Sequence, residues 1–204
     1  MRLGLVVNPD AGLGGKLGFK GSDGRAAEAR AAGAEDRAGP RMAHCLSHLV
    51  TLVASSLNRT NVRLELVVWE GRMGGAWVPE LDADSPVSVR SVGSTPSTTT
   101  PEDTTRLVGD LLESGVEAIV YAGGDGTTRD IVNALEAAGT EAKKTAVIGV
   151  PGGVKMHSGC FATTPKAAAE VVLSFAIGDL RTAITEVMDL DETVYAKGEW
   201  KVRM

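Results

Sequence analysis

The sequence has few cysteines and no long apolar run, and both absences restrict the class of protein. Its two cysteines, Cys45 and Cys160, match neither a zinc-binding spacing nor a small disulfide framework, so we expect both to be reduced. No segment approaches the roughly 20 consecutive apolar residues that a membrane-spanning helix needs. The apolar run near the amino terminus, residues 3–7, is too short for a signal peptide. We therefore expect a soluble, cytoplasmic protein.

Basic and aromatic residues are also scarce. The 21 Lys and Arg residues are outnumbered by 26 Asp and Glu residues, and the net charge of -5 would repel a nucleic-acid backbone. The tryptophans at positions 69, 77 and 200 are too dispersed to form a base-stacking platform. We expect neither nucleic acid nor a membrane among the partners, and any bound polyphosphate must be neutralised locally. Hydrophobic residues, at 43% of 204 positions, suffice for one sizeable core.

Short β-prone runs alternate with helical segments along the chain. Runs rich in apolar and β-branched residues predict strands over residues 3–7, 62–69, 86–92, 117–121 and 145–150. Composition and helical spacing predict helices over residues 26–38, 41–57, 101–114, 128–138 and 165–177, the first ending near Gly39-Pro40. Thr100 is expected to cap the third of these helices, with Pro101 at its first position. The alternation predicts an α/β fold with a mostly parallel sheet and helices on both faces.

The last 24 residues carry a different pattern. Trp200, Val202 and Met204 alternate with basic residues as in a half-buried strand, and residues 181–188 are another strand candidate. We therefore expect residues 1–180 to form an α/β nucleotide-binding domain and residues 181–204 to begin a β-rich second domain that is incomplete. The sequence is expected to be part of a longer protein.

Three unusual turns follow the predicted strands that end at Val7, Tyr121 and Val150. Ligands of open α/β sheets bind beyond the carboxyl ends of the strands, so these turns are the expected location of the functional site. The first turn, residues 8–24, contains six glycines and two lysines, Lys16 and Lys20. Its amide and ammonium groups could approach phosphate oxygens. It matches neither the P-loop nor the dinucleotide-binding glycine motif, so a plain surface loop stays open as an alternative.

The second turn, residues 122–127, leads from a buried strand directly into a helix. Glycines let a phosphate chain approach main-chain N–H groups, and the helix amino terminus adds partial positive charge. Asp125 is the unusual member of this turn, because a carboxylate beside phosphates is repulsive unless it binds Mg²⁺ or hydrogen-bonds a hydroxyl. Both arrangements occur in phosphoryl transfer. A structural turn stays open as an alternative.

The third turn combines glycines with a cation. Gly152 and Gly153 supply backbone freedom, and Lys155 could hold a phosphate. His157 and Ser158 could hydrogen-bond the acceptor substrate. Ser158 is not in a Gly-x-Ser-x-Gly elbow, so a serine hydrolase is poorly supported.

Taken together, the three turns resemble motifs of one kinase superfamily. Residues 123–127, Gly-Gly-Asp-Gly-Thr, resemble the signature shared by NAD kinases and by diacylglycerol and sphingosine kinases. Residues 8–12, 20–24 and 150–158 resemble more particularly the ATP-NAD kinase-like branch that includes acetoin-catabolism protein X. The resemblance covers nearly the whole chain.

The resemblance implies a Rossmann-like, phosphofructokinase-like domain followed by a β-rich domain, with a catalytic cleft between them. ATP or polyphosphate would be the phosphoryl donor, with Mg²⁺ as the metal, and the 2′-hydroxyl of NAD would be the acceptor. Asp125 would be the catalytic residue and would engage that hydroxyl or the metal. We also expect nucleotides as partners and a homo-oligomer. The residues expected to bind the nucleotide are Asn8, Gly12, Lys16, Lys20, Gly123, Gly124, Gly126, Thr127, Gly152, Gly153 and Lys155.

The third turn also departs from the family. Typical NAD kinases carry Asn-x-Gly there and lipid kinases carry Gly-Thr-x-Asn-Asp, and the Asn-Glu pair that helps to bind NAD in the family has no match in this sequence. Two alternatives therefore stay open beside an NAD kinase. One is a lipid kinase, and the other is a nucleotide-binding regulatory domain without catalysis.

Overall fold

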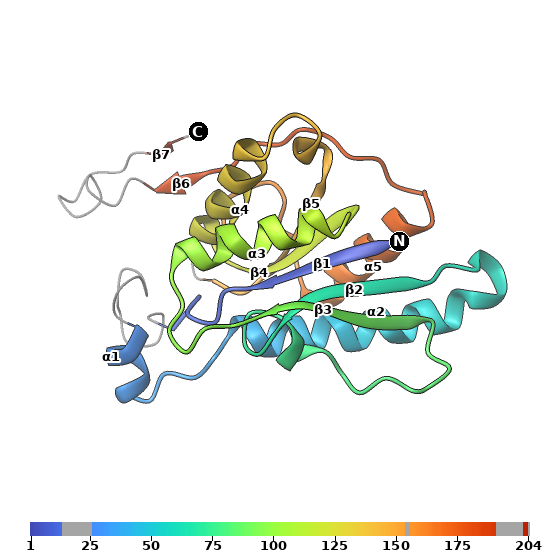
Figure 1. The fold of residues 1–204 in the computed structure, drawn as a ribbon, viewed down its shortest axis with the longest axis horizontal. Helices are drawn as coiled ribbons and strands as arrows, with labels where there is room; N and C mark the ends of the chain where they lie inside the picture. The colour runs from blue at the N-terminus through green and yellow to red at the C-terminus, as the bar shows by residue number, and fades with distance from the viewer. Residues whose placement is uncertain (14–25, 154–155, 191–201, 204) are drawn as a thin grey trace.

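The computed structural model describes residues 1–13, 26–153, 156–190 and 202–203, and its elements are shown in Figure 1. The strands are β1 (Arg2–Val7), β2 (Leu64–Glu70), β3 (Val87–Ser94), β4 (Ala118–Gly123), β5 (Ala146–Pro151), β6 (Asp189–Leu190) and β7 (Val202–Arg203). The helices are α1 (Ala26–Ala31), α2 (Ala38–Thr60), α3 (Pro101–Glu113), α4 (Asp125–Ala137) and α5 (Pro165–Ala176), with short 3-10 turns η2 (Gly75–Trp77) and η3 (Ala142–Lys144).

A five-stranded parallel sheet forms the centre of the molecule, in the order β3-β2-β1-β4-β5. The central strand β1 pairs with β2 on one side, where Leu3 is opposite Leu66, and with β4 on the other, where Leu5 is opposite Val120. Both β2 and β4 follow β1 in the chain but lie on opposite sides of it. The strand order therefore reverses direction between β1 and β4, and open α/β sheets bind ligands outside the carboxyl ends of the strands at such a point.

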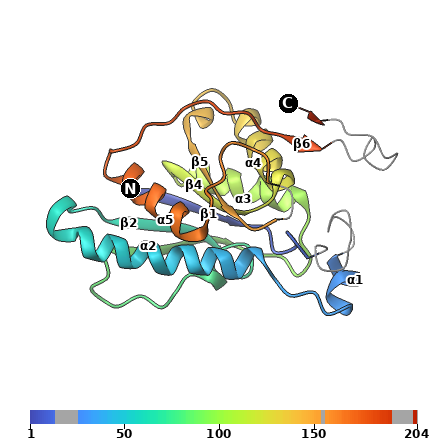
Figure 2. The ribbon, with the colours of Figure 1, turned by 180° about the vertical axis from the view of Figure 1, so that it is seen from behind.

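Helices cover both faces of the sheet. Leu5 and Val7 of β1 pack with α2 and α5 on one face, whereas Val6 packs with α3 and α4 on the other. Figure 1 shows α3 and α4 in front of the sheet, and Figure 2 shows α2 and α5 in front of it. A strand that is buried on both faces needs a continuous apolar run, which explains the composition of residues 3–7. The predicted α/β, Rossmann-like fold with helices on both faces is confirmed.

Two helices begin as local sequence rules require. Pro101 is the first residue of α3, and Thr100 and Asp103 form a capping box in which the Asp103 carboxylate accepts the Thr100 N–H at 2.8 Å. Pro165 is the first residue of α5, and the Thr164 hydroxyl accepts the Ala167 N–H at 3.0 Å. The predicted cap of α3 is confirmed.

The predicted helix over residues 26–38 is wrong in its extent. The helix α1 ends at Ala31, and Gly33 follows with φ of +84°, a left-handed conformation that ends helices. Gly39 and Pro40, expected to terminate this helix, lie instead in the first turn of α2. Pro40 is tolerated there because the first helical turn has no intrahelical N–H bond to lose. Gly39 is needed because a Cβ atom would lie 2.0 Å from the Trp77 ring.

The prediction of a strand over residues 181–188 is also wrong. These residues have no regular secondary structure, and residues 181–186 are exposed. The strands β6 and β7 form an antiparallel pair beyond them, with Leu190 opposite Val202. That residues 181–204 begin a second domain stays a prediction, because residues 191–201 lie outside the described part. None of the helices in the described ranges is long and apolar enough to span a membrane.

Candidate functional site

The turns after β1, β4 and β5 meet at the carboxyl edge of the sheet. Asn8 holds the first turn to the second, because its N–H donates to the Ala122 carbonyl at 3.0 Å and its Nδ2 donates to the Thr127 hydroxyl at 3.0 Å. Its Oδ1 accepts the N–H of Asp10 at 3.0 Å, which stabilises the turn itself. Asn8, predicted to bind nucleotide, therefore fastens two of the three turns to each other.

Glycines let the second and third turns pack closely. The Gly152 N–H donates to the Gly123 carbonyl at 3.1 Å. A Cβ atom on Gly153 would lie 2.7 Å from the Gly124 Cα, so no larger residue fits there without backbone movement. Gly12 of the first turn reaches the same place with φ of +80°, and a Cβ on it would lie 2.7 Å from the Gly152 carbonyl oxygen. Predicted glycines from all three turns thus contact one another, namely Gly12, Gly123, Gly124, Gly152 and Gly153.

The helix α4 begins at Asp125, three residues earlier than predicted, with Gly124 as its N-cap. Asp125, Gly126 and Thr127 are therefore the first residues of the helix. The first N–H groups of an α-helix have no partner within the helix, and together with the helix dipole they favour an anion. The amino terminus of α4 lies beside the carboxyl ends of β1 and β4, where the free N–H groups and the helix dipole would both stabilise a bound phosphate.

Asp125 is buried, with 3% of its surface exposed, and its carboxylate is held by the third turn. Its Oδ1 accepts the N–H groups of His157 and Ser158 at 3.0 and 2.9 Å and the Ser158 hydroxyl at 2.7 Å. Its Oδ2 accepts the N–H of His157 at 2.8 Å. These charge-assisted hydrogen bonds compensate the cost of burying the carboxylate. The side chain of His157 is exposed, and its backbone makes the contact.

Asp125 was also predicted to bind a metal ion, and the side chains around it bear on that prediction. Among residues 1–13, 26–153, 156–190 and 202–203, no group of three or more His, Cys, Asp or Glu side chains could hold a metal ion. Both Asp125 oxygens accept hydrogen bonds from the third turn. Metal binding by Asp125 stays a prediction, and the chemistry proposed below does not pass through a metal.

The three lysines predicted to bind phosphate, Lys16, Lys20 and Lys155, lie outside the described residues. Their roles stay predictions. The other predicted nucleotide-binding residues all lie in or beside the three converging turns, and Thr127 is buried there with its hydroxyl accepting from Asn8.

A chain of polar groups lies beneath the second turn. The Tyr121 hydroxyl hydrogen-bonds with the Thr128 hydroxyl and with Cys160 Sγ, the latter at 3.2 Å. The Tyr121 ring packs against Phe161 with 5.5 Å between ring centroids. Burial raises the pKa of the Tyr121 hydroxyl and of the Cys160 thiol. Both groups therefore stay protonated at neutral pH and support the turn. Cys45 and Cys160 are both free thiols, as the sequence predicts.

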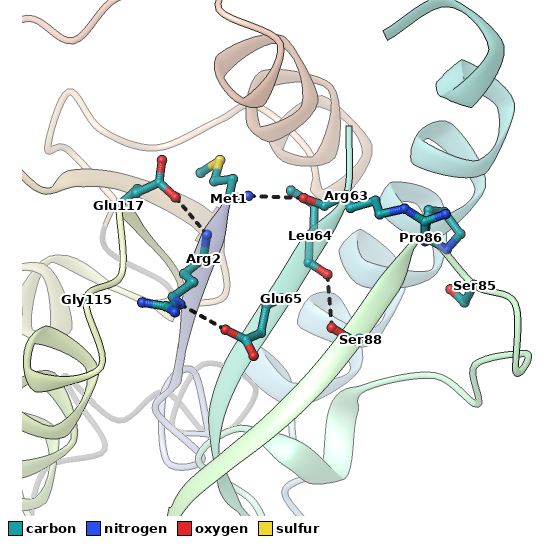
Figure 3. Close-up of a pocket in the computed structure, with 10 residues that line it drawn as sticks. All are labelled: Met1, Arg2, Arg63, Leu64, Glu65, Ser85, Pro86, Ser88, Gly115 and Glu117. Carbon is teal, nitrogen blue, oxygen red and sulfur yellow. Dashed lines mark hydrogen bonds and ion pairs between the residues drawn. The ribbon is translucent and has the colours of Figure 1, made fainter. Parts of the chain in front are cut away.

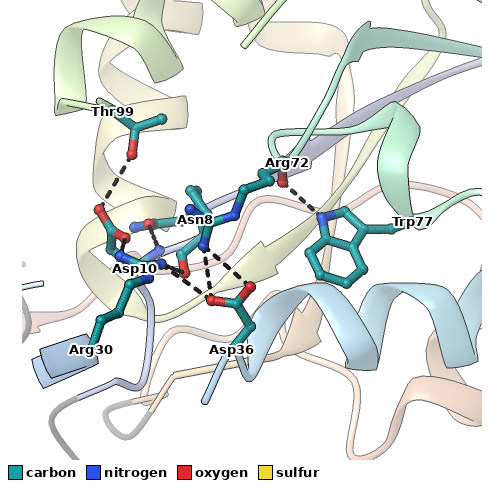
Figure 4. Close-up of polar contacts among 8 residues, drawn as sticks. Asn8, Asp10, Arg30, Asp36, Arg72, Trp77 and Thr99 are labelled. Carbon is teal, nitrogen blue, oxygen red and sulfur yellow. Dashed lines mark hydrogen bonds and ion pairs between the residues drawn. The ribbon is translucent and has the colours of Figure 1, made fainter. Parts of the chain in front are cut away.

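Two arginines and two aspartates connect the first turn to α1 and to the loops that contain Asp36 and Arg72, as Figure 4 shows. Arg30 donates to Asp10 at 2.6 Å and to Asp36 at 3.1 Å, and Arg72 donates to Asp36 at 2.8 Å. Burial alone would lower the pKa of Arg30, but its bonds to Asp10 and Asp36 outweigh burial and raise that pKa. This network was not predicted, because no local sequence pattern marks it. Arg30 and Asp10 are 20 residues apart in the sequence, Arg72 and Asp36 are 36 apart, and Arg30 and Asp36 are six apart.

A pocket of about 420 Å³ lies at the opposite edge of the sheet, beside the amino ends of β1, β2 and β3 (Figure 3). In this pocket Arg2 Nε donates to Glu65 at 3.0 Å, and the backbone N–H of Arg2 donates to the Glu117 carboxylate at 2.9 Å. Ligands of open α/β sheets bind at the carboxyl edge, so we place the functional site at the three turns.

Ser158, considered from the sequence as a contact of the phosphoryl-acceptor substrate, is 4% exposed in the structure, and its hydroxyl donates to Asp125. Its second partner is the backbone of Met188, 30 residues further along the chain. Backbone groups carry no sequence signature, so only the folded chain reveals this contact.

The family model described as the ATP-NAD kinase N-terminal domain matches residues 3–179, which include all three turns. Searches of curated proteins and of solved structures found no match. The family match supports a phosphoryl-transferring kinase in general, with nucleotides as substrates. Since the matched region covers most of the sequence and its fold is Rossmann-like, this chain belongs to the ATP-NAD kinase family.

Proposed function

We propose that this chain transfers a phosphoryl group from ATP, or from polyphosphate, to the 2′-hydroxyl of NAD. The observation that carries the proposal is the meeting of three glycine turns around the amino terminus of α4, at the carboxyl ends of β1 and β4, where the strand order reverses. Crevices at this position of open α/β sheets bind nucleotides. Membership of the ATP-NAD kinase family supports phosphoryl transfer as the reaction.

The nucleotide phosphates are proposed to lie against the start of α4. Gly126 and Thr127 would present backbone N–H groups there, and the positive end of the helix dipole would favour the phosphate charge. The chain carries a net charge of -5, so the remaining phosphate charge must be neutralised by cationic side chains close to it. Lys16, Lys20 and Lys155 are the proposed cations.

Asp125 is the proposed proton acceptor. When the acceptor oxygen attacks the γ-phosphorus, the bond from phosphorus to the ADP oxygen breaks and the hydroxyl proton passes to the carboxylate. Oδ1 already accepts from three donors, whereas Oδ2 accepts only from the His157 N–H among the described residues. Oδ2 is therefore the oxygen that can accept a substrate hydroxyl. Because Asp125 is 3% exposed, the third turn must move slightly to admit that hydroxyl.

The test is an assay of NADP formation from NAD by the full-length protein with the magnesium salt of ATP, repeated with polyphosphate as donor. The informative variant is Asp125→Asn, which keeps the size of the side chain and removes its charge. The matched control is Glu113→Gln, the same change at an exposed carboxylate at the end of α3. We expect the control to match the wild type and Asp125→Asn to lower kcat roughly 10²- to 10⁴-fold.

Two results would contradict the proposal. Absence of NADP with either donor would rule out an NAD kinase, and a parallel panel of diacylglycerol and sphingoid acceptors would then detect a lipid kinase. Equal rates for Asp125→Asn and the wild type would rule out Asp125 as proton acceptor. Thermal unfolding of each variant separates lost catalysis from lost folding.

A second function is favoured by the burial of Asp125. A carboxylate held by four hydrogen bonds from the third turn can serve as a structural fastener in a domain that binds nucleotide without catalysis. In that case calorimetry would detect ATP or NAD binding although no acceptor is phosphorylated. Location in the cytoplasm and assembly into a homo-oligomer stay predictions.

A further inference from the structure

The hydroxyl of Ser158 lies between Asp125 and the segment that leads away from α5. It donates to Asp125 Oδ1 at 2.7 Å and accepts the N–H of Met188 at 3.0 Å. The Met188 carbonyl oxygen, at 3.3 Å, competes for the single hydroxyl proton. The carboxylate is the closer and the charged acceptor, so it takes this proton. A hydroxyl that donates to a carboxylate is also a stronger acceptor, which strengthens its bond from Met188.

The segment 185–188 rests directly on the third turn. The Gly159 N–H donates to the Glu186 carbonyl at 3.3 Å, and a Cβ atom on Gly159 would lie 2.1 Å from the Thr185 hydroxyl oxygen. After Met188 the chain enters β6, which lies beside α4 in Figure 1. The segment therefore connects the end of the α/β unit to the part of the chain that contains β6 and β7.

The contact of Ser158 is buried, so water cannot replace a lost partner there. Ser158 is 4% exposed and Asp125 is 3% exposed. If the segment moved away, the Ser158 hydroxyl would lose its donor. If Asp125 turned away, the hydroxyl would lose its acceptor and could rotate toward the Met188 carbonyl. Movement of the segment leaves the buried Ser158 hydroxyl without its donor, and loss of Asp125 leaves the buried Ser158 N–H without its acceptor; both changes are costly.

We propose that Ser158 is a positioning residue that couples the Asp125 carboxylate to the segment 185–188. Displacing the segment then changes how Asp125 is held, and by linkage any change at Asp125 alters the segment. The coupling is a property of the folded chain. Its consequence for catalysis rests on the proposed function.

Hydrogen exchange of the Met188 amide tests the coupling without an activity assay. In Ser158→Ala the amide loses its acceptor, and we expect its exchange to be up to roughly tenfold faster. In Asp125→Ala, which does not touch Met188, we also expect faster exchange there. The double variant should exchange no faster than Ser158→Ala, because both changes break one chain of hydrogen bonds. Glu113→Gln serves as the control and should exchange like the wild type.

The outcome that overturns the proposal is an unchanged Met188 amide in Asp125→Ala while the amides of His157 and Ser158 exchange faster. If Ser158→Ala does not fold, Gly159→Val tests the coupling by displacing the segment instead. The valine side chain should push Thr185 away and speed exchange of the Ser158 amide. Unchanged exchange of that amide would also overturn the proposal.

Kinetics then separate the coupling from the proposed function. If NADP is formed, we expect Ser158→Ala to lower kcat more than KM for NAD or ATP, and Ser158→Thr, which keeps the hydroxyl, to recover kcat. If no variant forms NADP, the proposed function fails while the exchange results still decide the coupling. Equal losses of kcat in Ser158→Ala and Ser158→Thr would show that the hydroxyl does not position Asp125.

Discussion

The contact between the first and third turns can be tested by substituting Gly12. In Gly12→Ala the residue keeps φ near +80°, which L residues avoid, and the new Cβ lies 2.7 Å from the Gly152 carbonyl oxygen and 3.2 Å from Arg37 Cδ. Gly33 provides a matched control. Its φ is +84°, but no described atom lies within 4 Å of the position of a Cβ.

The two variants should lose different amounts of stability. The left-handed conformation costs an alanine roughly 1–2 kcal/mol, and both variants incur this cost. Only Gly12→Ala adds an overlap with a backbone carbonyl in a closely packed region, which costs roughly 1–3 kcal/mol more. We therefore expect Gly33→Ala to lose about 1–2 kcal/mol and Gly12→Ala to lose about 2–5 kcal/mol.

Urea denaturation followed by circular dichroism measures both values, with stability taken from the midpoint and the m-value. An unchanged m-value is needed for the comparison, because it shows that the unfolded state is the same. Equal losses for the two variants would refute the reasoning, since they would mean that Gly12 does not lie against the third turn.

Three further predictions concern the rest of the fold. Gly109→Ala, in the interior of α3 with no described atom near its Cβ position, should raise stability by roughly 0.5–1 kcal/mol in the same urea experiment. Asp103→Ala should lose about 1 kcal/mol through the capping box. Burial tends to raise the pKa of Asp103, but its bonds to Arg106 and Thr100 outweigh burial and lower it. The stability from this carboxylate is thus present at neutral pH and should be lost as the pH falls below about 4, so wild type and Asp103→Ala should converge in acid. Burial raises the pKa of Cys45 to about 12, so this thiol should resist a thiol reagent at pH 8 in the folded protein and react after denaturation.

Much of the fold follows from local sequence. The apolar run at residues 3–7 predicts a strand buried on both faces, and the Thr100-Pro101 start predicts α3, because these signals depend on neighbouring residues. Where the signal was local but ambiguous, the prediction was wrong. Gly39-Pro40 is compatible with either the end of one helix or the beginning of the next. In the structure both residues lie in the first turn of α2, where Gly39 packs against the Trp77 ring and leaves no room for a Cβ atom.

Some features of the candidate site also follow from local sequence, whereas others depend on tertiary contacts. The sequence by itself determined that three glycine turns follow strands and that Asp125 stands at the start of a helix, because strand, turn and helix signals are short-range. Only the tertiary structure decided what Asp125 contacts. Its partners, His157 and Ser158, are 32 and 33 residues away, and three of the four hydrogen bonds come from backbone N–H groups. Every residue except proline has such a group, so its use becomes visible only when the sheet brings the second and third turns together.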